Sequence, residues 1–232
     1  MILPGDRMSV TKPTTVSREA AESLLESMVY IVDDEDAVRR ALGGLLQSVG
    51  LSVETFASSQ DFMASPRQNA PSCLILDIRL RGENGLEFQD AMGRIGLRIP
   101  VVFVTGHGDI EMSVKAMKAG AMDFLTKPFR EQDVLDAVSR ALAKDRERLC
   151  DERFIGSLRA AYESLTPRER EVAGFVLAGL LNKQIAAEMN VSEITVKMHR
   201  GQVMKKLSAR SVVELVDKLR PLGIDPRTKN GQ

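Results

Sequence analysis

Short apolar runs alternate with amphipathic stretches along the first two thirds of the chain, and this alternation restricts the fold more than any other feature. The apolar runs lie at 29–32, 51–56, 73–77, 101–105 and 124–127, and the helical stretches at about 36–49, 58–65, 84–94, 110–119 and from 130 onward. The segments CLIL and VVFV are apolar throughout, as strands buried on both faces are. The pattern predicts an α/β fold with an open parallel sheet of five strands and right-handed crossovers.

Polar side chains follow four of these five runs. Asp33 and Asp34 follow the first, Asp77 ends the third, Thr105 ends the fourth and Lys127 ends the fifth. Because ligands of parallel α/β sheets bind beyond the carboxyl ends of the strands, we expect these side chains to share one site. The second run offers no comparable residue, and we expect it at an edge of the sheet.

The residue types in this set suit phosphoryl chemistry. Converging carboxylates raise one another's pKa unless a cation lies among them, and carboxylates with water are the ligands that Mg²⁺ prefers. A lysine and a hydroxyl would suit a phosphoryl group carried by a carboxylate nucleophile, for which the central Asp77 is best placed. Taken singly, each residue has an ordinary explanation; Asp34 to Asp36, for example, could cap the following helix. Their joint position at strand ends favours a functional site.

The stretches IVDDE, LILDIRL, VFVTGHGD and FLTKPF resemble response-regulator receiver domains over roughly residues 28–145. The resemblance implies a CheY-like, flavodoxin-type, doubly wound sheet with strand order 2-1-3-4-5. It also implies that Asp77 is the phosphoacceptor, that Thr105 and Lys127 contact the phosphoryl group, and that Phe124 is a switch aromatic. The implied Mg²⁺ ligands are Asp34, Asp77, the carbonyl of Arg79 and, through water, Asp33.

The loop after Asp77 departs from the family pattern. It reads RLRGENG, with Arg81 where proline is usual and Gly85 still at the flexible position. We therefore expect an intact site with altered loop rigidity or kinetics. The resemblance further implies a cis peptide bond between Lys127 and Pro128, a bond type that proline makes accessible.

The formal net charge of zero is unevenly distributed. Residues 28–127 contain ten Lys/Arg and thirteen Asp/Glu, whereas residues 165–220 contain ten and six, which gives net charges of −3 and +4. A basic module is a candidate for binding nucleic acid. The basic part begins at LTPREREV, where a Thr-Pro-x-Glu pattern at 166–169 predicts a capping box and the start of a second, all-helical domain.

Residues 182–207 have the pattern of two helices joined by a tight turn. The first carries an apolar stripe, the turn lies at Asn190–Val191, and Ser192 can cap the second helix. In the second helix we expect Ile194, Val203 and Leu207 to face the core, with Val196 near its edge. The remaining faces are basic, which fits a recognition helix in the major groove, although basic solvated faces are common on helical bundles.

The sequence LTPREREV…GLLNKQIAAEMNVSEITVKMHR resembles the LuxR/FixJ-type DNA-binding domain over roughly residues 165–220. The resemblance implies a helix-turn-helix at 182–201, with Lys197 and Met198 as contacts to base edges. Gly201 stands where some relatives carry a base-reading lysine, whose role Arg200 or Gln202 could take over. The implied phosphate contacts, which position the protein without specifying sequence, are Lys183, Thr195, His199, Lys205 and Arg210.

Both resemblances together imply a response regulator of a bacterial two-component system, most similar to styrene- and toluene-responsive regulators of the FixJ branch. The implied partners are a sensor histidine kinase, double-stranded promoter DNA, RNA polymerase and, after phosphorylation, a second copy bound through helix four, strand five and helix five at about 110–140. The expected domains are an N-terminal tail (1–27), the receiver (28–143), a helical linker (144–164), the LuxR-type domain (165–225) and a C-terminal tail (226–232).

Two other functions fit parts of the sequence. The receiver could be a phosphate-independent interaction platform attached to a DNA-binding domain. The acids could instead belong to a Mg²⁺-dependent phosphohydrolase, but no second acid/base is evident, and we expect no enzyme beyond self-directed phosphotransfer. The lack of a long apolar stretch and the use of only two cysteines, Cys73 and Cys150, indicate a cytoplasmic protein with no membrane partner.

Overall fold

The computed structural model describes residues 27–80, 82–106 and 110–224. The predictions for residues 1–26, for Arg81 and for the tail at 226–232 lie outside these ranges. The chain divides into two compact units, Met1–Arg148 and Leu149–Gln232. In the described ranges, no helix combines the length and the apolar character that crossing a membrane requires.

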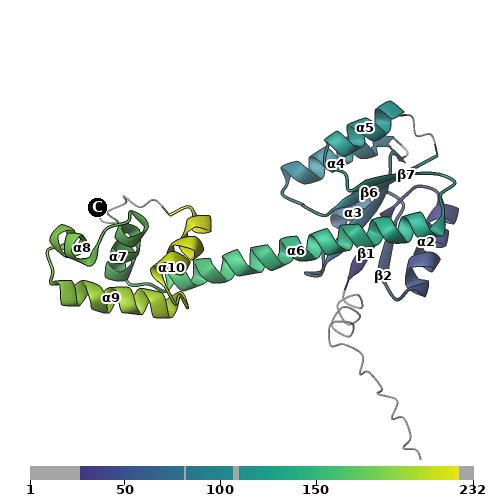
Figure 1. Ribbon diagram of the computed structural model, residues 1–232. Coiled ribbons are helices and arrows are strands. Elements are labelled where there is room, and N and C mark those ends of the chain that lie inside the picture. The colour runs from purple at the N-terminus through teal and green to yellow at the C-terminus, as the bar shows by residue number, and fades with distance from the viewer. Residues whose placement is uncertain (1–26, 81, 107–109, 225–232) are drawn as a thin grey trace, which may run out of the picture. The chain divides into compact units, whose positions relative to one another are not determined.

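The first unit contains a five-stranded parallel sheet with the order β2-β1-β3-β6-β7 (Figure 1). Since β6 and β7 are its fourth and fifth strands along the chain, the predicted order 2-1-3-4-5 is confirmed, with β2 at an edge. The strands are β1 (Met28–Val32), β2 (Ser52–Phe56), β3 (Ser72–Asp77), β6 (Val101–Thr105) and β7 (Asp123–Thr126).

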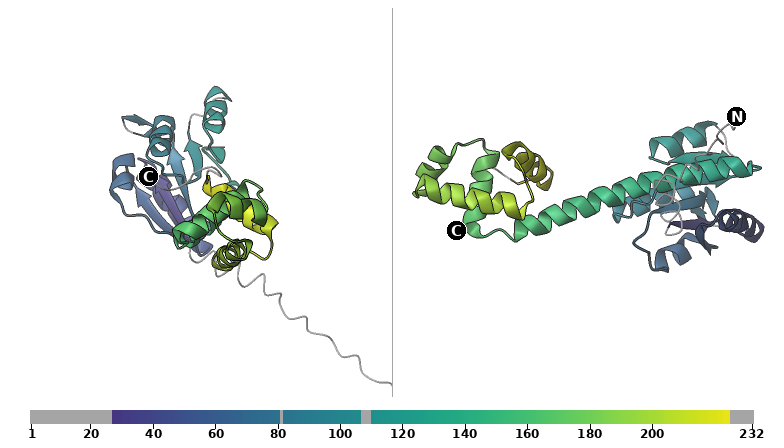
Figure 2. Two further views of the ribbon diagram at one scale, coloured as in Figure 1. Left: turned by 90° about the vertical axis from the view of Figure 1, so that its left-hand side faces the viewer. Right: turned by 60° about the horizontal axis from the view of Figure 1, so that its bottom comes forward.

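Helices cover both faces of the sheet (Figures 1 and 2). Alternate residues of β1 point to opposite faces: Tyr30 and Val32 pack with α3, α4 and α5, whereas Val29 and Ile31 pack with α2 and the first half of α6. This double burial explains why the central strands are apolar throughout. The helices are α2 (Asp36–Ser48), α3 (Ser59–Ala64), α4 (Gly85–Arg94), α5 (Ile110–Lys118) and α6 (Glu131–Glu163).

A small antiparallel hairpin follows Asp77 and was missed by the sequence reasoning. It consists of β4 (Arg79–Leu80) and β5 (Glu83–Asn84), and two-residue strands show no periodicity that could predict them. The hairpin turns the chain directly into α4, because the Asn84 side chain accepts a hydrogen bond from the Leu86 amide at 3.0 Å. The Gly85 amide also donates to the carbonyl of Ile78 at 2.8 Å.

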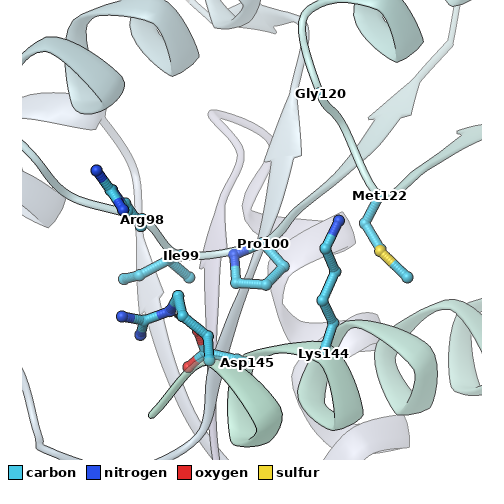
Figure 3. A pocket seen from close by; sticks show the side chains of 8 residues that line it. Arg98, Ile99, Pro100, Gly120, Met122, Lys144 and Asp145 are labelled. Atoms are coloured by element: carbon cyan, nitrogen blue, oxygen red, sulfur yellow. The ribbon is translucent and has the colours of Figure 1, made fainter. Parts of the chain in front are cut away.

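The long helix α6 is anchored at the amino-terminal edge of the sheet. The buried carboxylate of Asp145 accepts hydrogen bonds from the Ser72 amide, at the start of β3, and from Arg148 Nε, both at 2.8 Å. Beside this anchor lies a small pocket between α6 and the residues before β6 and β7 (Figure 3). The anchor and the pocket are therefore at the edge opposite to the predicted phosphoryl site.

The second unit is entirely helical over its described residues. It begins within α6, and its further helices are α7 (Pro167–Leu177), α8 (Asn182–Met189), α9 (Glu193–Lys206), α10 (Val212–Leu219) and the 3₁₀ turn η1 (Arg220–Leu222) (Figure 1). The predicted capping box at the start of α7 is present: Thr166 Oγ1 accepts from the Glu169 amide at 3.3 Å, and the Glu169 carboxylate accepts from the Thr166 amide at 2.8 Å. Ser192 caps α9 through the Thr195 amide, as predicted.

The expected orientation of one residue in α9 was wrong. Ile194 is 81% exposed, whereas Val196, which we expected at the edge of the core, is fully buried together with Val203 and Leu207. At about 100° per residue, Ile194 lies about 200° around the helix from Val196. Once Val196 and Val203, seven residues apart, share the buried face, Ile194 must point outward.

The Glu169 carboxylate also forms an ion pair, with Lys206 at 2.7 Å. The hydrogen bond from Lys206 holds the pKa of Glu169 below its ordinary value, outweighing the opposite effect of burial. A carboxyl with a lowered folded-state pKa stabilises the fold above its unfolded-state pKa of about 4.5, and the contribution is lost as the pH falls through the folded-state value.

We expect Glu169→Gln, which keeps the cap but removes the charge, to lower the stability of the second unit by about 1 kcal/mol at neutral pH. The difference from wild type should shrink below pH ~4.5. Hydrogen exchange of peptides from α7 and α9, in the full-length wild type and variant, measures this difference in stability. A difference that is independent of pH would contradict the assignment.

Candidate functional site

Three carboxylates gather at the carboxyl ends of the neighbouring strands β1 and β3. Asp33 directly follows β1 and Asp77 ends β3, and both residues are buried, with exposed fractions of 2% and 5%. Carboxylate oxygens of Asp33, Glu35 and Asp77 lie within 4.8 Å of one another. In the described ranges, this is the group of acids close enough to share one cation, and Asp34, which is half-buried, is not part of it.

Lys127 places its ammonium group among these acids. Its Nζ lies 2.8 Å from Asp33 Oδ2, 3.0 Å from Asp77 Oδ2 and 3.1 Å from Glu35 Oε1. The Lys127 amide donates to the Thr105 carbonyl at 2.8 Å, which joins the ends of β6 and β7, and the Lys127–Pro128 bond is cis, as expected. The structure thus brings together residues that are up to 94 positions apart in sequence.

The electrostatics of the cluster favour a charged lysine. Burial raises the pKa of Asp33, while the hydrogen bonds from Lys127 and from the Glu35 amide act in the opposite direction. Burial alone would lower the pKa of Lys127, but its hydrogen bonds to Asp33, Asp77 and Glu35 outweigh this and raise the pKa above its ordinary value. Lys127 is therefore a fixed positive charge at neutral pH, held by three carboxyl groups.

Glu35 is the member of the cluster that the sequence reasoning missed. Asp33 Oδ1 accepts a hydrogen bond from the Glu35 amide at 2.8 Å, and this short turn brings the Glu35 side chain back toward Asp33. The alternative in which the acids only cap α2 is weakened, because the N-cap residue is Glu35 and its side chain makes no capping hydrogen bond. Asp36 instead pairs with Arg39 and Arg40 on the helix surface.

The other predicted receiver residues border the same edge of the sheet. Thr105 is fully buried at the end of β6, next to Thr126 of β7 in register. The Arg79 amide donates to Asp77 Oδ1 at 3.0 Å, so the backbone of Arg79 lies against the carboxylate. Phe124 of β7 is half-buried and packs against the core under α4 and α5.

The predicted DNA contacts differ in how freely they are presented. Lys197, Met198 and Lys205 are exposed on α9, as are Lys183 on α8 and Arg210 after α9, whereas Thr195, His199 and Arg200 are half-buried. Arg200 Nη1 donates to Asn182 Oδ1 at 2.7 Å, which ties α9 to the start of α8. The Arg200 guanidinium thus already has a partner between the two helices, while Lys197 and Met198 point into solvent from the first turns of α9.

Both halves of the chain match known protein families. Residues 29–139 match the response regulator receiver domain, and residues 163–219 match the bacterial regulatory proteins of the luxR family. The chain is 47% identical to Nodulation protein W of Bradyrhizobium diazoefficiens over 203 residues. This alignment covers 88% of this chain and 89% of that protein. The chain is a LuxR-type response regulator. This regulator joins a receiver domain to a DNA-binding domain and belongs to a family of transcriptional regulators.

Further relatives support this assignment along the length of the regulator. It is 49% identical over 191 residues to the response regulator protein TmoT of Ectopseudomonas mendocina, covering 82% of this chain and 87% of that one. The solved structure of the response regulator StyR is 43% identical and superposes with a TM-score of 0.75 over 84% of this chain and 99% of that one. The confirmed sheet order and the helical second unit therefore belong to a known two-domain family.

Proposed function

We propose that the regulator is switched by phosphorylation of Asp77, with a sensor histidine kinase as the phosphoryl donor and promoter DNA as the target. The observation that carries the proposal is the contact of Lys127 Nζ with both Asp33 and Asp77 at the carboxyl edge of the sheet. In the transfer, an Asp77 carboxylate oxygen would form the new O–P bond while the P–N bond to the kinase histidine breaks. Lys127 and the buried Thr105 would then contact the phosphoryl oxygens.

The donor set of the cluster fits Mg²⁺. Hard carboxylate oxygens from Asp33 and Asp77 lie together, and the Arg79 backbone lies against Asp77, so its carbonyl is a further candidate ligand with Asp34. The bound ion would neutralise charge on the transferring phosphoryl group. Glu35, also within reach of Lys127, adds to the negative charge that attracts a divalent cation.

Phosphorylation would act on the receiver through added charge. A phosphoryl group brings a charge of about −1.5 to −2, which would draw Thr105 and Lys127 toward Asp77 and bias the adjacent α5, β7 and the start of α6. We propose that this face, about 110–140, then forms a homodimer, with RNA polymerase as a further partner. A dimer would place two α9 helices on half-sites about 34–36 Å apart.

The proposed domains remain the receiver at 28–143, the helical linker at 144–164 and the DNA-binding domain at 165–225.

The test uses beryllofluoride, a mimic of the phosphoryl group, with Mg²⁺ and the full-length regulator. We expect the wild-type mass in size-exclusion chromatography with light scattering to double when both are added. Asp77→Ala should stay monomeric because it lacks the acceptor carboxylate. If both proteins bind DNA and keep one mass under all conditions, the phosphate-independent alternative is correct and the switch is wrong.

A further inference from the structure

Two apolar side chains stand exposed on the recognition helix α9. Ile194 is the most exposed of the large hydrophobic residues that the structure describes, at 81%, and Met198, one turn later, is 56% exposed. An exposed β-branched residue brings little to a helix, since isoleucine is a weaker helix former than alanine. Neither side chain belongs to the buried core of the second unit. Their exposure leaves both side chains available for a contact outside the fold.

These side chains belong to one outward-facing stripe. Residues Ile194, Lys197, Met198 and Gly201 follow the spacing i, i+3, i+4 and i+7, which places them on one side of a helix, and all four are exposed. The buried residues Val196 and Val203 lie on the other side. A Cβ added at Gly201 would contact nothing within 4 Å, so the stripe also ends in open space. It thus consists of two apolar side chains around one lysine.

The stripe lies on the part of α9 that would enter the major groove. In helix-turn-helix proteins, the N-terminal residues of the recognition helix contact base edges, and Ile194 and Lys197 occupy the first two turns. Two basic residues of α9 outside the stripe already have partners within the protein: Arg200 donates to Asn182, and Lys206 pairs with Glu169. Lys197 is the polar side chain of the stripe, and it can donate a hydrogen bond to a base edge.

We propose that Ile194 is a specificity-determining residue that, together with Met198, recognises the C5-methyl group of thymine in each half-site. The thymine methyl is the apolar feature of the major groove, and apolar side chains discriminate it, whereas lysine favours guanine. The positions of Ile194 and Met198 are four residues apart and thus about 6 Å along the helix axis, which corresponds to one or two base pairs at about 3.4 Å each. The half-site would therefore contain closely spaced thymines beside a guanine that faces Lys197.

This inference rests on the proposed promoter binding, and its test separates the two. Duplexes are first selected from a random DNA library with full-length wild-type regulator in beryllofluoride and Mg²⁺. Each thymine of the selected site is then replaced singly by deoxyuridine, which lacks only the methyl group, and the affinity is measured by fluorescence anisotropy at one fixed salt concentration. We expect wild type to lose about fourfold in affinity at the thymine that faces Ile194.

The variant Ile194→Ala should bind the thymine and deoxyuridine duplexes equally at that position, because the contact is already lost. Val213→Ala, which truncates another exposed apolar residue, on α10 (71% exposed), is the matched control and should keep the wild-type pattern. Equal deoxyuridine losses in wild type and Ile194→Ala at every position would overturn the inference while leaving promoter binding intact. If Ile194→Ala keeps the wild-type pattern of deoxyuridine losses but changes the mass of the regulator in solution, Ile194 is instead a contact to another protein chain. Selection of no duplex by wild type would show that promoter binding itself fails.

Discussion

Lys127→Ala is expected to lower the free energy of unfolding of the receiver by about 3 kcal/mol in buffer without divalent cations. The lysine is 15% exposed and contacts Asp33, Glu35 and Asp77. Its removal leaves two buried carboxylates beside each other with no cation, and breaking a buried pair on one side is costly because the remaining charge is uncompensated. The cost is electrostatic, and therefore another cation at the same place should reduce it.

Urea unfolding with and without millimolar Mg²⁺ measures this effect. We expect Mg²⁺ to stabilise Lys127→Ala more than wild type, because the ion binds only the folded state and no longer competes with the ammonium group. The control is Lys115→Ala on α5, which removes an exposed lysine paired with Glu111 at 2.8 Å and should cost about 0.5 kcal/mol or less. Equal stability of Lys127→Ala and wild type in both buffers would refute the proposed charge balance.

Gly85→Ala is expected to destabilise the receiver by about 3 kcal/mol and to abolish its response to beryllofluoride. A Cβ at Gly85 would lie 2.5 Å from the carbonyl oxygen of Asp77 and 3.0 Å from the Cα of Ile78. Both are backbone atoms next to the phosphoacceptor, so the clash can be relieved only by moving the end of β3 or the start of α4. The requirement for glycine here is close approach rather than the flexibility that the sequence suggested.

Thermal unfolding of the full-length protein and its mass with beryllofluoride test this prediction. The matched control is Gly44→Ala in α2, where an added Cβ meets nothing within 4 Å. Alanine there should stabilise the protein by about 0.5–1 kcal/mol, because it removes glycine's excess freedom in a helix. If Gly85→Ala is as stable and as responsive as wild type, the packing of Gly85 against Asp77 does not constrain the site.

The sequence by itself determined the architecture and the edge of the sheet at which the acids meet. The alternation of apolar runs with helical stretches was sufficient for an open parallel sheet of five strands, because parallel strands need crossovers and runs such as VVFV must be buried on both faces. The strand order came from the resemblance to receiver domains. Since parallel strands end at one edge, Asp33, Asp77 and Lys127 could be placed together before any contact was known. The capping box at Thr166 was equally readable, since it depends on residues three positions apart.

Only the tertiary structure decided which side chains complete these sites. Glu35 joins the acid cluster because a turn at Asp33 folds it back, and Gly85 meets Asp77 because a hairpin without a recognisable pattern brings α4 there. Ile194 faces solvent because the burial of Val196 and Val203 fixes the rotation of α9 about its own axis. Local spacing defines the period of a helix or strand, but its phase is set by the elements packed against it, and the phase determines which residues reach the ligand.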